Sequence, residues 1–231
     1  MPQTSTENLQ ICKVQFPEIE LKTRDAHKLR GYFGSLFKEH SPLLSNHYED
    51  GSLRYRYPLV QYKVIDKTPM LVGINEGSQL LTQLFLKIKE LNIDGKTYPI
   101  QSKNISSSTI KIGFSEQLHE YKFETLWLAL NQKNYQKFNQ LQDEAEKDDM
   151  LRSILVGHVL SFFRNTGVEL EKSQRLMAKL DVEQKQTKFK DKTMLAFTGS
   201  FVVNANLPDD IGLGKSVARG FGSIEKNGLN G

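Results

Sequence analysis

The residues best suited to chemistry form one segment near the C-terminus, 212–222, which reads Gly-Leu-Gly-Lys-Ser-Val-Ala-Arg-Gly-Phe-Gly and is called the glycine-rich segment below. Its four glycines allow the backbone to approach an anion closely and to offer it N–H donors. Lys215, Ser216 and Arg219 stand between the glycines and add two cations and a hydroxyl group. This composition predicts a loop that binds a phosphate group.

Two familiar phosphate-binding motifs do not fit the glycine-rich segment. A Walker loop requires a glycine five positions before Gly214, where the chain has Asp209. A dinucleotide-binding fingerprint requires a glycine three positions after Gly214, where the chain has Val217. Both motifs are therefore excluded. A glycine-rich turn without any ligand is the remaining alternative, and the basic residues within the segment weaken it.

The composition is that of a globular protein with a small excess of positive charge. Of the 231 residues, 38% are hydrophobic and 25% charged, so disorder is not expected, and the length suits two domains. The net charge of +4 permits a nucleic-acid partner without requiring one. Cys12 is the only cysteine, which excludes an internal disulfide and favours a cytoplasmic location. No apolar stretch reaches membrane-spanning length, so no membrane partner is expected.

Hydrophobic periodicity predicts an α+β protein. For residues 11–114 the expected order is strand, helix, strand, strand, helix, strand, which defines a ferredoxin-like unit. The expected strands are 11–21, 52–65, 70–74, 97–101 and 109–114, and the expected helices are one that starts at residue 23 or 25 and one over 76–91.

From about residue 116 a second, degenerate unit of the same kind is expected. Its elements are a strand over 121–130, helices over 134–142 and 149–165, and a hairpin of 178–189 and 193–204, after which the glycine-rich segment and residues 223–226 complete the chain. We therefore predict two tandem ferredoxin-like (RRM-like) domains, 1–115 and 116–231. The glycine-rich segment belongs to the second domain in this prediction.

The whole C-terminal pattern resembles that of one protein family. An apolar strand, the proline-containing turn 207–211 and then Gly-x-Gly-x5-Gly-x-Gly resemble the glycine-rich loop of the repeat-associated mysterious protein (RAMP) superfamily. Within that superfamily the chain is most similar to the CRISPR-associated endoribonuclease Cas-six, which cuts precursor CRISPR RNA (pre-crRNA) within its repeats. The resemblance implies tandem ferredoxin-like domains, in agreement with the periodicity, and CRISPR repeat RNA as the partner.

Histidine is the side chain best suited to proton transfer near pH 7 in a sequence without a cysteine nucleophile or a recognisable metal cluster. RNA supplies its own nucleophile, the 2′-hydroxyl. Cleavage then needs a base for the 2′-hydroxyl proton, an acid for the leaving 5′-oxygen, and cations for the charge on phosphorus. We expect neither a metal ion nor another cofactor. The expected products carry a 2′,3′-cyclic phosphate (or a 3′-phosphate) and a 5′-hydroxyl.

Three of the five histidines have a simpler explanation than catalysis. His158 lies on the apolar side of its expected helix, which indicates a core residue. His27 is expected to face solvent on the first turn of its helix, and His119 falls in the expected link between the domains. His40 and His47 therefore remain as candidates.

The resemblance adds that catalytic histidines of Cas-six proteins commonly lie at or just after the end of the first helix. His40 matches this position most closely, and either His47 or Tyr48 is expected to supply the second proton-transfer group. From the residues alone, His40 is equally consistent with a helix cap or a core residue. His47 is equally consistent with an exposed loop residue.

Several basic residues are candidates for holding the RNA backbone. Lys215, Ser216 and Arg219 are expected to contact the phosphate next to the cut. Arg54 and Arg56 share one face of an expected strand, because side chains alternate along a strand. Lys188 and Lys190 in the hairpin are weaker candidates, since neighbouring acidic residues make a solvated surface the simpler alternative.

Two other functions remain open from the sequence. A non-catalytic RNA-binding RAMP subunit of a CRISPR effector complex would have the same fold and would bind RNA without cutting it. A ferredoxin-like regulatory protein outside CRISPR biology would bind a free nucleotide and no RNA. Association with subunits of an effector complex, and formation of a homodimer, are also left open.

Overall fold

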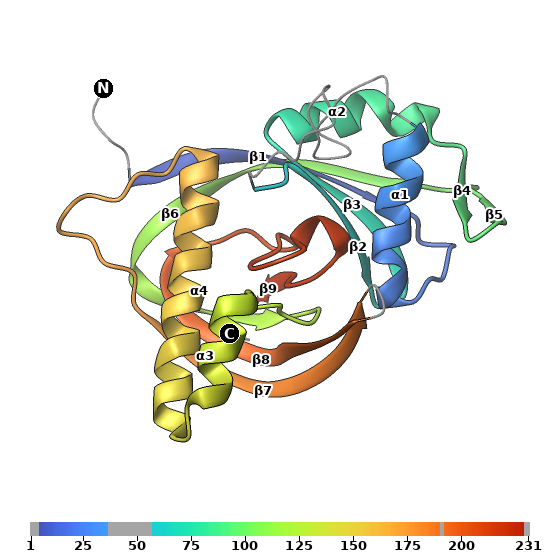
Figure 1. Ribbon diagram of the computed structural model, residues 1–231. Helices are drawn as coiled ribbons and strands as arrows, with labels where there is room; N and C mark the ends of the chain where they lie inside the picture. Colours follow the sequence, from blue (N-terminus) through green and yellow to red (C-terminus); the bar gives the residue numbers. More distant parts are fainter. Residues whose placement is uncertain (1–4, 37–56, 190–191, 229–231) are drawn as a thin grey trace, which may run out of the picture. The chain divides into compact units, whose positions relative to one another are not determined.

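The computed structural model describes residues 5–36, 57–189 and 192–228 (Figure 1). The chain divides into two compact units. The N-terminal unit consists of Asn8–Ile110 and Val217–Gly220, and the C-terminal unit consists of Met1–Glu7, Lys111–Ser216 and Phe221–Gly231. Each unit is described by itself.

The N-terminal unit is an antiparallel sheet with two helices. Its elements in chain order are β1 (Thr6–Gln15), η1 (Thr23–Asp25), α1 (Ala26–Leu36), β2 (Val60–Ile65), β3 (Thr68–Ile74), α2 (Glu76–Leu84), η2 (Phe85–Lys87), β4 (Glu90–Ile93), β5 (Lys96–Pro99) and the start of β6 (Asn104–Phe123). The strand order in the sheet is β2-β3-β1-β6, and β3 pairs antiparallel with both β1 and β2. The short strands β4 and β5 form a separate hairpin. The predicted order of strands and helices is therefore present, with this hairpin added before the last strand.

The hydrophobic core of this unit lies between the sheet and its two helices (Figure 1). Helical spacing places Leu29 and Phe33 of α1 on the buried side, and strand alternation places Tyr62 of β2 opposite them. The Phe33 ring stacks on Phe16 at 6.3 Å and on Tyr62 at 5.8 Å between ring centroids. This aromatic stack fixes α1 against β2.

The second helix is shorter than predicted. The expected helix over 76–91 ends at Leu84, continues as the short η2, and gives way to β4, in which Leu91 is buried. Lys103 donates hydrogen bonds of 2.7 Å to the carbonyls of both Phe85 and Ile88, which satisfies backbone acceptors at the point where the helix stops. Leu91 lies three residues after Ile88, as in a helix, and two before Ile93, as in a strand, which explains the wrong boundary.

The C-terminal unit consists of antiparallel strands and two helices. It contains the rest of β6, α3 (Gln132–Gln140), α4 (Glu144–Thr166), β7 (Ala178–Phe189), β8 (Lys192–Asn206) and β9 (Ile224–Lys226). β6 pairs with β9 and with β8, and β8 pairs with β7 along the whole hairpin, so the strand order is β9-β6-β8-β7. The helices and the hairpin confirm the prediction. The expected strand over 121–130 does not, because β6 ends at Phe123 and Trp127 makes only an isolated bridge with Phe197.

Both helices of this unit begin at a side-chain cap and pack on the sheet (Figure 1). The side chain of Asn131 accepts the N–H of Asn134 before α3, and Asp143 accepts the N–H of Ala145 before α4. The core contains a group of packed aromatic rings, Tyr121, Phe123, Trp127, Phe138, Phe197 and Phe201. Within the ranges described, no helix has the length and apolar character needed to cross a membrane.

Candidate functional site

The two ends of the glycine-rich segment are bonded to each other in the C-terminal unit. Gly212 and Ser223 form an isolated β-bridge, and the N–H of Leu213 donates to the carbonyl of Gly222 at 2.9 Å. The N–H of Gly222 in turn donates to the carbonyl of Leu126 at 2.9 Å. These bonds close the segment into a loop whose two ends are fixed. Its middle, Val217–Gly220, belongs to the N-terminal unit and includes the short helix η3 (Val217–Arg219).

The first half of the segment packs on the residues that follow β6. Gly214 has a φ of 98°, and a Cβ at this position would lie 2.8 Å from Nε1 of Trp127 and 2.9 Å from the carbonyl oxygen of Leu128. Both the backbone conformation and the close approach therefore require glycine. The N–H of Lys215 donates to the carbonyl of Leu128 at 3.0 Å, while the side chain of Lys215 is exposed. The lysine is thus held by its backbone and presents its ammonium group to solvent.

The second half of the segment packs on α1 and β2. Gly220 has a φ of 87°, and a Cβ there would lie 2.6 Å from Cβ of Ala26 and 3.1 Å from the carbonyl oxygen of Tyr62. Arg219, the preceding residue, is half-buried. The close approach of Gly220 therefore sets where the guanidinium group of Arg219 emerges.

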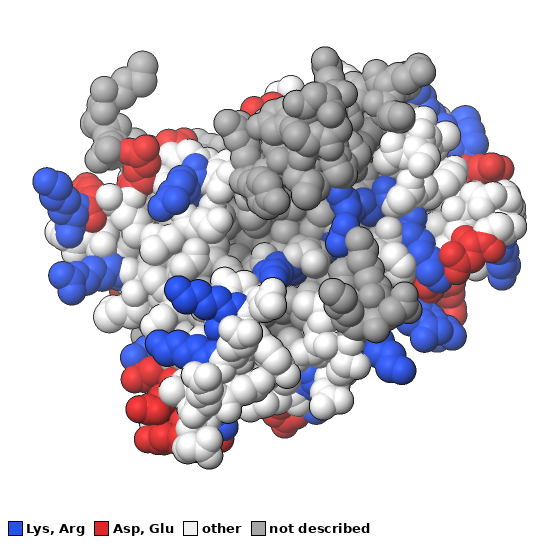
Figure 2. All heavy atoms as spheres, in the orientation of Figure 1, with Lys and Arg blue, Asp and Glu red and all other residues white. Residues whose placement is uncertain are grey.

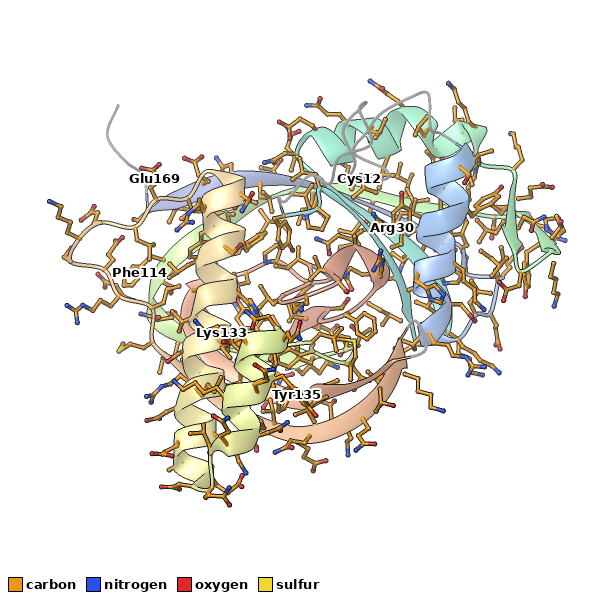
Figure 3. All side chains as sticks on the ribbon, in the orientation of Figure 1. Cys12, Arg30, Phe114, Lys133, Tyr135 and Glu169 are labelled. Carbon is orange, nitrogen blue, oxygen red and sulfur yellow. The ribbon has the colours of Figure 1, made fainter. Side chains whose placement is uncertain are left out.

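Arg30 lies close to Arg219 and was not predicted from the sequence. It follows Ala26 by one helical turn on the same side of α1, and Figure 3 shows it extending from α1 toward β2. Burial lowers the pKa of the half-buried Arg30, and the positive charge of Arg219 lowers it further. Arg30 falls among the polar positions of the helix, and only the tertiary contact of η3 with α1 distinguishes it from other surface arginines.

The sequence predicted that backbone N–H groups of the glycine-rich segment would bind an anion, but four of them bind carbonyl groups of the chain. The N–H groups of Leu213, Lys215, Gly220 and Gly222 all donate to carbonyl groups of the chain itself. The glycines at 214 and 220 serve close packing. Ser216 lies next to Lys215 with a φ of 57° and is half-buried.

The structure places the predicted residues in three groups. Lys215 and Ser216 are neighbours in the C-terminal unit, and Arg219 belongs to the N-terminal unit. Lys188 is exposed near the end of β7. His40, His47, Arg54, Arg56 and Lys190, together with Tyr48, lie outside the described residues.

The three histidines that the structure describes have distinct surroundings. His27 is exposed, and its Nδ1 donates to the carbonyl of Arg24 at 2.6 Å, in agreement with the predicted solvent-facing position. His119 lies within β6, opposite Val203 of β8, and its Nε2 is 3.0 Å from the hydroxyl oxygen of Ser115. Burial, followed by the charge of Lys226, lowers the pKa of His119.

His158 on α4 is half-buried and packs on Trp127. The indole Nε1–H of Trp127 donates to Nδ1 of His158 at 3.3 Å, and the two rings are almost perpendicular at 5.8 Å between centroids. Burial lowers the pKa of His158 to about 4, and the charge of Lys215 contributes to this shift. His158 therefore packs against the core as predicted, but it also lies beside the glycine-rich segment, which the sequence did not indicate.

Acidic groups are concentrated elsewhere in the C-terminal unit. The exposed Glu144, Glu146, Asp148 and Asp149 occupy the first turns of α4 and form the red cluster near the junction of α3 and α4 in Figure 2. Carboxylates at this end of a helix are favoured by its dipole. In the described part of the chain, no three or more His, Cys, Asp or Glu side chains are grouped to hold a metal ion.

Comparison with known proteins gives consistent matches along most of the chain. The family models for the Cas6b N-terminal domain and the Cas6b C-terminal domain match residues 7–111 and 113–227. A protein of Methanocaldococcus jannaschii is 34% identical over 142 residues, which are 62% of this chain and 95% of that protein.

Two crystal structures have the same fold. One, of Cas6b, matches with a TM-score of 0.90 and 31% identity over 96% of this chain and 100% of that chain. Another, of the CRISPR RNA processing endoribonuclease Cas6b, matches with a TM-score of 0.78 and 28% identity over the same shares of 96% and 100%. Together with the two family models, which cover both halves of the sequence, these matches show that the chain belongs to the Cas6b family of CRISPR RNA processing endoribonucleases.

Proposed function

We propose that this protein binds CRISPR repeat RNA and cleaves pre-crRNA by attack of a 2′-hydroxyl on the adjacent phosphate, without a metal ion. The observation that carries the proposal is the way in which the glycine-rich segment holds its cations in a chain of the Cas6b family. Close packing at Gly214 and Gly220 leaves Lys215 and Arg219 on well-defined backbone, where each can meet a phosphate oxygen.

In the proposed reaction the 2′-oxygen bonds to phosphorus while the bond from phosphorus to the 5′-oxygen breaks. One group takes the proton of the 2′-hydroxyl, and a second gives a proton to the leaving 5′-oxygen. The products are a 2′,3′-cyclic phosphate, which hydrolysis converts to a 3′-phosphate, and a 5′-hydroxyl. We assign the two proton transfers to His40 and His47, which follow α1 in the sequence.

The remaining predicted residues are proposed to bind RNA. Lys215, Ser216 and Arg219 hold the phosphate next to the cut, because they combine positive charge with a short hydroxyl donor. Arg54, Arg56, Lys188 and Lys190 contact phosphates farther along the backbone. The strands of each unit follow the order of a ferredoxin-like unit, β2-β3-β1-β6 and β7-β8-β6-β9, which supports tandem ferredoxin-like domains as the architecture.

The test is cleavage of end-labelled CRISPR repeat RNA in the presence of EDTA, beside the same RNA with a 2′-deoxy nucleotide at the cut. We expect one cut in the all-ribose RNA and none in the deoxy RNA, because the deoxy RNA lacks the nucleophile. Equal cutting of both RNAs would refute 2′-hydroxyl attack, and loss of all cutting in EDTA would refute the metal-independent reaction. Tight binding with no cut under any condition would identify a non-catalytic RNA-binding subunit instead.

The histidine assignment is tested by His40→Ala and His47→Ala, with His27→Ala as the matched control on α1. We expect the first two variants to lose at least about 100-fold in the single-turnover cleavage rate, while RNA binding is retained. His27 is exposed near the start of α1, where its Nδ1 donates to the carbonyl of Arg24, so its variant should cut normally. Normal cutting by both of the first two variants would remove them from the mechanism.

A further inference from the structure

Three parts of the C-terminal unit that are distant in sequence meet around one imidazole ring. Trp127 follows β6, His158 comes from the middle of α4, and Gly214 with Lys215 comes from the glycine-rich segment. The indole ring lies between the other two parts, because its Nε1 bonds His158 and also limits the space at Gly214. We call these four residues the His158 cluster.

The hydrogen bond from Trp127 determines which nitrogen of His158 carries the proton. An indole N–H can only donate, so Nδ1 of His158 must accept. The neutral ring therefore carries its proton on Nε2. Nε2 forms no hydrogen bond with any other residue in the described ranges, and the half-buried ring has its fully buried neighbour Trp127 on the Nδ1 side. A hydrogen-bond donor is thus available on the other side of the ring.

Lys215 supplies a positive charge near the His158 ring. Its backbone is anchored on Leu128 and its side chain is exposed, close enough to His158 to disfavour protonation of the ring. Because the ring stays neutral at pH 7, the two side chains present one positive charge and only N–H donors. An arrangement of donors without an acceptor suits a ligand that offers several oxygen acceptors and negative charge, as a phosphate diester does.

The acidic residues of α4 lie at its start, away from His158. The acidic first turns end at Asp149, and His158 lies nine residues farther on, about 13 Å along the helix axis. Exposed charges at that distance are largely screened at physiological salt. The acidic turns thus repel RNA locally without cancelling the attraction of Lys215.

We propose that His158 and Lys215 together bind one phosphate group of the RNA backbone, with Nε2–H of His158 and the ammonium group of Lys215 contacting its oxygens. The inference rests on the proposed function for the nature of the ligand, and it assigns to His158 a direct contact with RNA. Trp127 then acts as a positioning residue, because its indole N–H holds the imidazole in the tautomer that donates from Nε2.

The first test measures the affinity for repeat RNA that carries the 2′-deoxy substitution and cannot be cut. His158→Phe keeps a ring of similar size and removes the donor, and we expect about tenfold weaker binding. His158→Gln keeps an amide N–H at a similar reach and should stay within about threefold of the wild type. Ser153→Ala, at an exposed position on another side of α4, is the matched control and should bind normally.

The salt dependence of binding separates the two contacts. Lys215→Ala should lower the slope of log K against log salt by about 0.7, since each cation on a single-stranded phosphate releases counterions. His158→Phe should leave that slope unchanged, because the neutral ring releases none. The fold-loss of RNA affinity in the double variant should be smaller than the product of the two single fold-losses, since both side chains contact the same phosphate.

The outcomes distinguish this proposal from the proposed function. Wild-type RNA affinity in a folded His158→Phe protein would overturn the shared phosphate site. A double variant whose loss of affinity equals the product of the two single losses would overturn it as well. Neither outcome affects cleavage by the wild type. If the wild type neither binds nor cuts repeat RNA, both proposals fail. If His158→Phe does not fold, the proposal is tested instead by NMR of the His158 imidazole in the wild-type protein. The Nε2 proton must shift on saturation with the deoxy RNA, and an unchanged resonance overturns the proposal.

Discussion

Replacement of Gly220 by alanine is the sharpest test of how the glycine-rich segment is held. Gly220 combines a left-handed φ of 87° with a close approach to α1. A Cβ would lie 2.6 Å from Cβ of Ala26, which is part of a helix and cannot rotate away, and 3.1 Å from the backbone oxygen of Tyr62. The segment or the helix must therefore shift to admit one methyl group.

The expected loss follows from these two effects. A left-handed φ costs a residue with a Cβ about 1–2 kcal/mol. Overpacking a closely packed site costs about 1–3 kcal/mol. We expect Gly220→Ala to lower the free energy of unfolding by about 2–5 kcal/mol, which for a chain of this size corresponds to a fall of about 5–15 °C in Tm. RNA affinity should fall as well, since the preceding residue is Arg219.

Thermal unfolding followed by circular dichroism provides the measurement, with Gly31→Ala as the control. Gly31 lies within α1, and a Cβ there meets nothing within 4 Å. Alanine is the better helix former, so this control should gain about 0.5–1 kcal/mol. An unchanged Tm for Gly220→Ala, or equal shifts in both variants, would refute the argument that close packing fixes the segment.

Two further predictions concern stability. The buried Tyr121 hydroxyl donates to the carbonyl of Ala205 at 3.1 Å and accepts the N–H of Leu207 at 2.9 Å. Tyr121→Phe should therefore lower the free energy of unfolding, measured by chemical denaturation, by about 1–3 kcal/mol. An unchanged denaturation midpoint would contradict this role. The folded-state pKa of His158, about 4, lies below its ordinary value of 6.5. Between these two values the unfolded chain therefore binds more protons than the folded chain. The contribution of His158 to the free energy of unfolding is complete above pH 6.5 and is lost as the pH falls toward 4. The slope should reach up to about 1.4 kcal/mol per pH unit and should flatten in His158→Gln, whereas parallel curves would show that another group is responsible.

The sequence was sufficient to predict those elements whose periodicity allows one interpretation. α1 and α4 have apolar residues at helical spacing, and the strands β7 and β8 were predicted nearly to their ends. The predicted helix over 76–91 is wrong at its C-terminus because Leu91 fits helical spacing with Ile88 and strand spacing with Ile93, and the deciding bonds come from Lys103, twelve or more residues away. Local patterns cannot contain such a tertiary contact.

The candidate site could be predicted only in part for the same reason. The glycine, lysine and arginine residues of 212–222 predict a phosphate-binding loop. In the structure Gly214 packs against Trp127 and Gly220 against Ala26, and these contacts cannot be predicted from the spacing of the glycines. His158 was interpreted from its helical face alone. Its position beside Lys215 brings together residues 57 positions apart in the chain, which no local pattern can indicate.

The division of the glycine-rich segment between the two units bears on how the chain is made. Most of the N-terminal unit emerges from the ribosome first, as Asn8–Ile110, yet its last piece is Val217–Gly220. At about 5–20 residues per second, Gly220 is synthesised roughly 8–40 s after Ala26 and Tyr62, the two residues on which it packs. The N-terminal unit therefore starts to fold first but is completed only after nearly all of the C-terminal unit has been synthesised.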